Sequence, residues 1–547
     1  MIKKLILIQI VLITGSFLTG FAQPSIQWQY SYGGTQPDGF ETGNGGRESM
    51  IPTADGGFVI AVSSNSDDID VSGHHGSTAM SDIWIFKIDS LGGIVWEKSL
   101  GGTGDERRPT IKSTSDGGYI LSSSTNSTDG DVTGFHDSLG TTNSDTWIVK
   151  LDSVGTIEWE HAFGGSDFED DASVCETADG GFLFICDTRS NDEDVSGSHG
   201  DTDILMMKLD HSGNVLWQKC IGGSSNDQAY TLRNTADSGF VFMGRTNSTD
   251  GDAVGNMHTS IFGANWVVKI DSLGNIEWQR AYGGSVIEFP GDIYQTSDGG
   301  YIFGTSTGSN DGDVTGNHGF EDYWIVRLDA TGNILWQKCF GGTNADSFKA
   351  LYPTSDNGVI ASGFSSCTDG DLTNNYGADD VWVIKLDSAG NLEWQRSFGG
   401  TMNDNGGTVL QTSDGGFIVC AESFSNDFDV SGHHGPSTQA DVWIFKLSPF
   451  TTGIEELASV SGLSVSPNPA SDQLKMSFYL SKVDDVSVEI MDIAGRIVKT
   501  WEMNRFVAGS HELTWDINSD SRPEEGLYFV RLTTPSQTIS KSILLSE

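Results

Sequence analysis

A repeated unit of about 60 residues occupies most of this chain, and it restricts the fold more than any other feature of the sequence. Each copy begins at a tryptophan that precedes a Gly-Gly pair by five residues, and successive tryptophans are 58 to 68 residues apart. A unit of this size cannot bury its apolar side chains alone, so neighbouring copies must pack against one another. The seven tryptophans are Trp28, Trp96, Trp159, Trp217, Trp278, Trp336 and Trp394.

Turn signals divide each unit into four short strands. In the second unit, tight turns are indicated by T-S-D-G-G at 114–118 and by D-S-V-G-T at 152–156. Glycine supplies the positive φ that such turns require, and apolar and polar residues alternate along the strands that follow. Four antiparallel strands in a tandem repeat are typical of propeller blades. We therefore predict an all-β chain with a seven-bladed β-propeller of four-stranded antiparallel blades, spanning residues 24–447.

The two ends of the repeat region predict how the ring closes. The last unit stops after its third strand, at 441–447, and lacks the tryptophan-containing fourth strand that ends every other unit. Residues 26–34 have the sequence of that missing strand with no blade before them. We expect residues 25–34 to complete the seventh blade, which would remove two exposed sheet edges.

Composition and charge exclude several classes of partner. The formal net charge is −45, which disfavours nucleic acid and anionic lipid as partners. Residues 1–22 combine a basic start, a short apolar run and small residues, as in a secretory signal peptide. No segment reaches the ~20 apolar residues that a membrane helix needs, so no membrane span is predicted. The six cysteines lack metal-type spacing and are expected in the core.

The longer loops of the blades carry the candidate site. They share one face of the predicted propeller, whereas the tight turns share the other, and binding concentrates on long loops. The loop between the second and third strands repeats S-x-D-x-D-V-[ST]-G-x-H-G. Closely spaced carboxylates are ligands that Ca²⁺ prefers, so this motif predicts calcium as a cofactor. The pairs are Asp68 and Asp70, Asp129 and Asp131, Asp192 and Asp194, Asp250 and Asp252, Asp311 and Asp313, Asp369 and Asp371, and Asp427 and Asp429.

Two other interpretations of this loop stay open. The aspartates can stabilise turns by bonding to the backbone while the histidine packs locally. Alternatively, the histidine can contribute to a transition-metal site. The histidines are His75, His136, His199, His318 and His434; His258 is displaced by one residue in the fourth unit, and Tyr376 replaces the histidine in the sixth.

A second domain follows the repeats. Residues 448–461 have the composition of a linker, and residues 462–547 contain strands of period two. The segment has a P-N-P-A entry at 467–470, a D-I-A-G-R turn at 492–496 and a G-L-Y-F-V-R-L strand at 526–532. These landmarks resemble the type A sorting domain of the type IX secretion system of Bacteroidota. The resemblance implies a small Ig-like β-sandwich, contact with the type IX machinery through residues 462–547, and export through the periplasm to the cell surface or medium.

The sequence favours a binding function. No nucleophile elbow, zincin helix or phosphate loop occurs, so no catalytic residue is predicted. We interpret the chain as an adhesin or as a propeller that binds a glycan or a protein. One alternative is an enzyme acting on extracellular polysaccharide, for which the irregular loops 136–144 and 256–264 are the asymmetric candidates. Another is a structural protein of a surface layer or biofilm.

Overall fold

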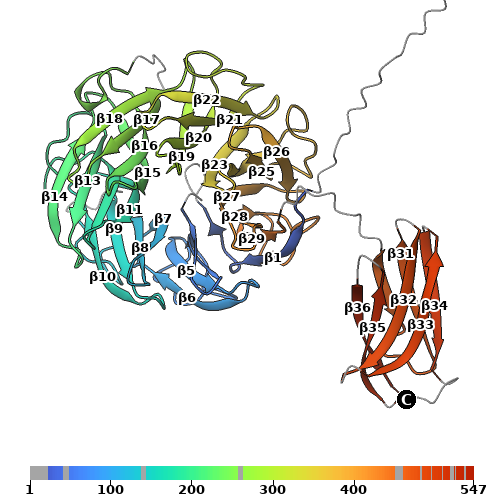
Figure 1. The fold of residues 1–547 in the computed structure, drawn as a ribbon. Coiled ribbons are helices and arrows are strands. Elements are labelled where there is room, and N and C mark those ends of the chain that lie inside the picture. Colours follow the sequence, from blue (N-terminus) through green and yellow to red (C-terminus); the bar gives the residue numbers. More distant parts are fainter. Residues whose placement is uncertain are drawn as a thin grey trace, which may run out of the picture. The chain divides into compact units, whose positions relative to one another are not determined.

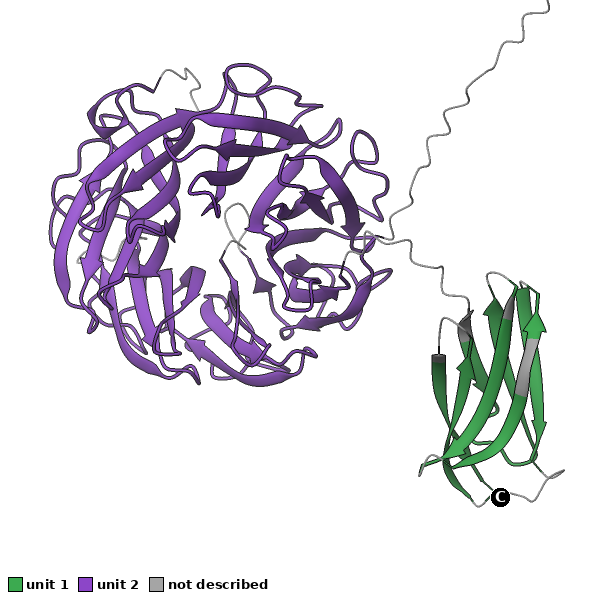
Figure 2. Cartoon of the chain, in the orientation of Figure 1, with its two compact units in different colours: residues 1–22, 450–547 green, residues 23–449 purple. Residues whose placement is uncertain are grey.

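The computed structural model describes residues 23–40, 48–136, 143–256, 263–449, 460–480, 483–493, 496–507, 509–517, 523, 525–534 and 538–546. The predicted signal peptide, most of the predicted linker, most of the loops 136–144 and 256–264, and His258 lie outside these residues. The chain forms two compact units. Residues 23–449 make one unit, and residues 450–547 belong to the other (Figure 2).

Seven antiparallel sheets follow one another around a ring in the first unit, which confirms the predicted propeller (Figure 1). Blade 1 contains β2 (Asp38–Gly39), β3 (Met50–Pro52), β4 (Phe58–Ser64), β5 (Asp82–Ile88) and β6 (Ile94–Leu100). Blade 2 contains β7 (Glu106–Ser113), β8 (Tyr119–Thr125), β9 (Asp145–Leu151) and β10 (Ile157–Phe163). Blade 3 contains β11 (Glu169–Glu176), β12 (Phe182–Thr188), β13 (Asp203–Leu209) and β14 (Val215–Ile221).

The remaining blades repeat this arrangement. Blade 4 contains β15 (Asp227–Asn234), β16 (Phe240–Thr246), the 3₁₀ turn η1 (Gly251–Ala253), β17 (Ala264–Ile270) and β18 (Ile276–Tyr282). Blade 5 contains β19 (Glu288–Gln295), β20 (Tyr301–Thr307), β21 (Asp322–Leu328) and β22 (Ile334–Phe340). Blade 6 contains β23 (Asp346–Pro353), β24 (Val359–Ser365), β25 (Asp380–Leu386) and β26 (Leu392–Phe398). Blade 7 contains β27 (Asp404–Gln411), β28 (Phe417–Ser423), β29 (Asp441–Leu447) and β1 (Ile26–Tyr32).

The first strand of each blade is the innermost one. β7, β11, β15, β19, β23 and β27 each contact the first strands of neighbouring blades around the central channel. In blade 7, the outermost strand comes from the start of the described chain. There β1 pairs antiparallel with β29, with Trp28 opposite Lys446.

Apolar side chains fill the space between neighbouring blades. One cluster joins Trp84 and Phe86 of blade 1 to Ile418 and Ile444 of blade 7, and all four side chains are buried. In six of the seven blades, the third strand carries a tryptophan that donates a hydrogen bond to the fourth strand, and blade 3 has Leu205 at this position. Trp147 Nε1 donates to Glu160 at 2.8 Å, and Trp443 donates to Gln29 across the ring closure at 2.8 Å. These tryptophans are therefore structural.

The repeated lysine of the third strand is also structural. Lys150 Nζ lies 2.9 Å from Asp116 of the tight turn and 2.8 Å from Glu158 of the fourth strand. The aspartate of the other tight turn binds its own backbone, since Asp152 accepts hydrogen bonds from the amides of Val154 and Thr156. Much of the repeated charge at the tight-turn face is thus used to hold the blades together.

The second unit consists of two sheets. One has the order β30 (Val460–Ser466), β31 (Gln473–Leu480), β34 (Gly509–Asp516). The other has the order β33 (Ile497–Phe506), β32 (Asp484–Asp492), β35 (Gly526–Thr533), β36 (Thr538–Leu545). Trp515, Ile490 and Val530 belong to the core of this unit. The arrangement agrees with the predicted Ig-like domain. Among the described residues, no helix has the length and apolarity needed to cross a membrane.

Candidate functional site

The first aspartate of each D-x-D pair binds the backbone of the loop that enters the same blade. Asp129 Oδ1 accepts a hydrogen bond from the Thr103 amide at 2.8 Å, and Asp131 Oδ2 accepts one from the Gly101 amide at 3.2 Å. The amide acceptors at the first position are Asp68, Asp129, Asp192, Asp250, Asp311, Asp369 and Asp427. Those at the second position are Asp70, Asp131, Asp252, Asp313 and Asp371.

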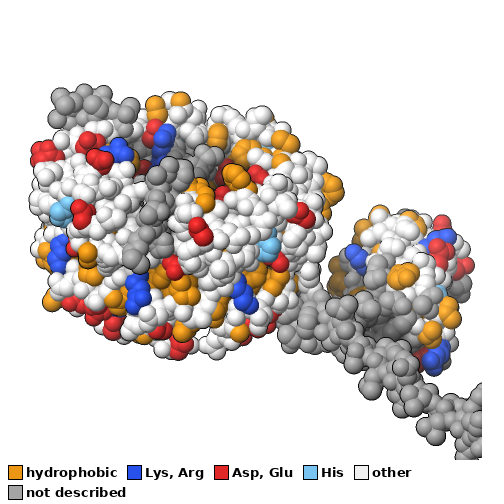
Figure 3. Space-filling model, turned by 90° about the horizontal axis from the view of Figure 1, so that it is seen from above, with side chains coloured by type: hydrophobic (Ala, Val, Ile, Leu, Met, Phe, Trp, Pro, Cys, Tyr) orange, Lys and Arg blue, Asp and Glu red, His pale blue; other side chains and the backbone are white. Residues whose placement is uncertain are grey.

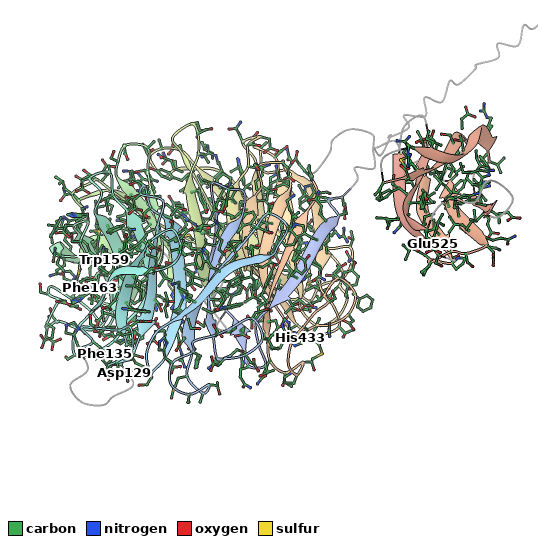
Figure 4. All side chains as sticks on the ribbon, turned by 90° about the horizontal axis from the view of Figure 1, so that it is seen from below. Asp129, Phe135, Trp159, Phe163, His433 and Glu525 are labelled. Atoms are coloured by element: carbon green, nitrogen blue, oxygen red, sulfur yellow. The ribbon has the colours of Figure 1, made fainter. Side chains whose placement is uncertain are left out.

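Two pairs depart from this pattern at the second position. Oδ2 of Asp194 and Oδ2 of Asp429 are buried without a hydrogen-bond partner, although the backbone amides of both residues donate to a glycine carbonyl as in the other five pairs. Asp129 and His433, from the polar loops of blades 2 and 7, lie at the same end of the propeller (Figure 4). The described residues contain no group of three or more His, Cys, Asp or Glu side chains arranged to hold a metal ion. Calcium at these loops stays a prediction, and the observed contacts favour the turn interpretation.

The histidine of the polar loop connects adjacent blades. His136 Nδ1 lies 2.7 Å from Asp145 Oδ2 of its own blade, and its Nε2 lies 3.6 Å from Asp194 Oδ2 of the next blade. His75 makes the same pair of contacts with Asp82 and Asp131, at 2.8 and 3.9 Å. In blade 6, the Tyr376 amide donates to Asp380.

Three carboxyl groups near the blade junctions, those of Glu169, Asp380 and Asp441, are buried. Burial raises the pKa to about 7 in Glu169 and Asp380, and to about 8 in Asp441. One oxygen of Asp380 and one of Asp441 are buried without a hydrogen-bond partner. Desolvation disfavours the charged form of such groups, so they are costly to ionise in the folded protein.

A second cluster of charge lies at the central channel, where the units do not resemble one another. Glu48 lies just before the inner strand β3 of blade 1. The inner strands of other blades contribute Lys112 from blade 2, Arg233 from blade 4, and Asp292 and Tyr294 from blade 5. Sequence analysis missed this cluster because it concentrated on repeated motifs and on irregular loops. The available signal was the variation of one inner-strand position, which is Lys112, Cys175, Arg233, Tyr294, Tyr352 and Leu410 in successive blades.

Glu48 is the centre of this cluster. Its Oε1 lies 2.6 Å from Arg233 Nη1 and 2.8 Å from Lys112 Nζ. Its Oε2 accepts a hydrogen bond from Ser173 Oγ at 2.8 Å. Burial by itself would raise the pKa of Glu48, but the charges of Arg233 and Lys112 hold it below the ordinary value. One carboxylate therefore connects four of the seven blades.

Arg233 extends the network to blade 5. Its Nη2 donates to both oxygens of Asp292, at 2.8 and 3.0 Å. Its guanidinium carbon lies 4.1 Å from the ring centroid of Tyr294, a distance typical of a cation–π contact. The charges of Arg233 and Lys112 are thus balanced by those of Glu48 and Asp292.

Three charged residues near the channel have a left-handed backbone. The φ angles are +54° at Glu48, +53° at Arg108 and +54° at Asp171. For residues other than glycine this conformation costs about 1–3 kcal/mol each, and it is concentrated at functional sites. Arg108 and Asp171 also contact each other, with Arg108 Nη1 3.3 Å from Asp171 Oδ1. The same conformation also occurs at Ile69, Glu193 and Phe428 in the repeated polar loops, so it is a feature of both ends of the blades.

A cavity of about 210 Å³ adjoins the Glu48 network. Its lining residues Pro52 and Ser113 directly precede the tight turns of blades 1 and 2, so the cavity lies toward the tight-turn end of the channel. Blades 6 and 7 contribute mainly apolar walls. The apolar and aromatic lining residues include Met50, Ile51, Ile111, Tyr294, Leu351, Tyr352, Val409 and Leu410.

Comparison with known proteins identifies the C-terminal unit. Residues 464–546 match the family model of the secretion system C-terminal sorting domain. A domain of this family directs the protein to the cell surface through the type IX secretion machinery. No curated protein sequence matches the chain.

Solved structures with propeller-like folds resemble the chain only distantly. A Dyadobacter fermentans protein of unknown function is 12% identical with a TM-score of 0.39, and the match covers 78% of this chain and 99% of that one. PorZ, a surface component of the type IX secretion system of Porphyromonas gingivalis, is 12% identical with a TM-score of 0.29, covering 92% and 75%. NanB sialidase of Streptococcus pneumoniae is 10% identical with a TM-score of 0.39, covering 78% and 94%. The strand pairing within the seven blades defines the propeller fold.

Proposed function

We propose that this is a secreted or cell-surface binding protein, an adhesin or a receptor for a glycan or protein, whose ligand enters the mouth of the propeller channel. The single observation that supports the proposal is the Glu48 network, because it departs from the repeat and lines a cavity of the channel. Burying charged side chains is costly, and folding of the blades alone does not require it at this place.

The contacts of the charged groups favour binding over catalysis. Each of the four charges in the network is paired with an opposite charge. The hydroxyl of Ser173 beside Glu48 and the thiol of Cys175 beside Lys112 are both buried, and neither residue lines the cavity, so no nucleophile faces a substrate there. The outer surface also carries charge of both signs, with acidic side chains beside Lys and Arg (Figure 3). Paired surface charges of this kind are typical of solvated faces and do not by themselves select a ligand.

The proposal is tested by binding of the full chain to arrays of glycans and extracellular-matrix proteins, in Ca²⁺ and in EDTA. Leu410→Trp places a bulky side chain in the channel cavity, and Leu216→Trp makes the same change at an exposed site on β14. We expect the Leu216→Trp variant to keep binding the ligand and the Leu410→Trp variant to lose this binding. Binding that is equal in both variants would place the ligand site elsewhere. Loss of binding in EDTA would support calcium at the D-x-D loops.

One observation favours an enzyme acting on polysaccharide. Asp170 and Asp187 lie opposite each other on β11 and β12, and burial together with the nearby Asp171 raises the pKa of both. A carboxyl kept neutral beside another carboxyl is a feature of general acid catalysis. Neither side chain lines the channel cavity, however, and both are buried. Hydrolysis of a polysaccharide panel that is abolished by Asp187→Asn would support this alternative.

A further inference from the structure

The channel cavity has one charged wall, and each cation on that wall is paired with an acidic side chain. Lys112 Nζ lies 2.8 Å from Glu48, and Arg233 lies 2.6 Å from Glu48 and 2.8 Å from Asp292. Lys112 Nζ donates further to the Leu232 carbonyl at 2.5 Å and lies 3.3 Å from Cys175 Sγ. A charged group entering the cavity would therefore find no unpaired counter-ion among its mostly apolar lining residues, which is costly. The electrostatics select an uncharged occupant.

The rest of the lining selects an apolar occupant with a flat face. Ile51, Leu351 and Leu410 present aliphatic side chains to the cavity. Tyr294 and Tyr352 meet edge to face, with ring centroids 5.7 Å apart and planes inclined at 73°. Such rings attract a further aromatic ring in an offset or edge-on arrangement. A sugar ring would bring several hydroxyls against aliphatic walls, where each unpaired hydroxyl costs binding energy.

The volume limits the occupant to one ring. An apolar cavity of about 150 Å³ in another protein stays dry and admits benzene. The cavity here, at about 210 Å³, has room for a six-membered ring with a short substituent.

We infer that the mouth of the propeller channel binds a single uncharged aromatic ring, either as a small molecule or as a ring presented by a larger ligand. This inference rests on the proposed binding function and specifies the chemistry that the site recognises. The aliphatic wall contributed by blades 6 and 7 supplies contact area, and the two tyrosines orient the ring. The charges of the Glu48 network are paired with one another, which disfavours binding of charged analogues.

Titration of the full chain with p-cresol, monitored by ligand-observed NMR, tests the inference. We expect saturable binding of p-cresol and weaker binding of cyclohexanol, which has similar size and no aromatic face. Benzoate and benzylammonium should show at least tenfold weaker binding than p-cresol, because each carries a full charge. Binding of either ion as tight as that of p-cresol would overturn the inference.

Three variants assign the signal to the cavity. Leu410→Trp should abolish p-cresol binding, and the exposed control Leu216→Trp should retain it. Tyr352→Leu, which keeps the cavity apolar but removes one ring, should weaken binding roughly 3- to 10-fold. Binding of p-cresol that survives Leu410→Trp would overturn the inference, as would the absence of any binding. If an array ligand is lost in Leu410→Trp while p-cresol fails to bind, the binding function stands and the ligand class is wrong.

Discussion

Replacing Glu48 by glutamine should destabilise the propeller by about 3 kcal/mol. The side chain is almost fully buried, with 1% of its surface exposed, and its charge faces both Arg233 and Lys112. Removing one partner of a buried ion pair typically costs about 3–5 kcal/mol, because the opposite charge is left without compensation. Arg233 keeps its two hydrogen bonds to Asp292, so we expect the lower end of this range.

Urea unfolding at pH 7, followed by tryptophan fluorescence, measures this change. Glu193→Gln is the matched control, since Glu193 also has a left-handed backbone, with a φ of +53°, but is exposed. The control should change the free energy of unfolding by less than about 0.5 kcal/mol. Adding Lys112→Met to Glu48→Gln restores charge balance, so the double variant should cost at least about 1 kcal/mol less than the sum of the single ones. A cost below about 1 kcal/mol for Glu48→Gln would refute the reasoning.

Three further predictions concern pH, the tail and calcium. The pKa values of Glu169, Asp380 and Asp441 are raised in the folded state, so the folded protein holds protons that the unfolded chain releases. The contribution of these three groups to stability is therefore complete below about pH 4 and is lost as the pH rises through 6–8. Tm should therefore fall between pH 5 and pH 8, and Asp441→Asn should flatten this dependence; a Tm that rises over this range contradicts it. Deleting residues 460–547 should leave the propeller in the periplasm, as cell fractionation would reveal, and its appearance outside the cell would contradict the assignment. Calorimetric titration with Ca²⁺ tests the D-x-D loops. If these loops bind Ca²⁺, Asp129→Asn should lower the number of sites that titrate, and an unchanged number would contradict calcium in blade 2.

Blade architecture was predictable from the sequence because its determinants are local. Turns such as 114–118 combine glycine with an aspartate that bonds to the adjacent backbone, and these contacts lie within a few residues. The lysine and tryptophan of the third strand recur in nearly every unit, which indicates a shared packing position. The sorting domain was predictable for a similar reason, since its landmarks are short stretches of consecutive residues.

The role of the repeated acids was not predictable in the same way. The spacing of Asp129 and Asp131 suits calcium and turn stabilisation equally well. Only the folded blade brings the amides of Gly101 and Thr103 to these carboxylates, across about 26 to 30 residues of sequence. The sevenfold motif thus predicts that the aspartates make the same contact in every blade, but it does not distinguish a metal ion from a backbone amide as the partner.

By itself, the sequence determined the strand pattern, the number of blades and the route of export, because each of these depends on short-range patterns repeated or clustered along the chain. Tertiary structure alone decided the candidate site. Glu48 and Arg233 belong to blades 1 and 4, and they meet only because closing the ring directs every first strand toward one axis. Side chains from distant units converge there.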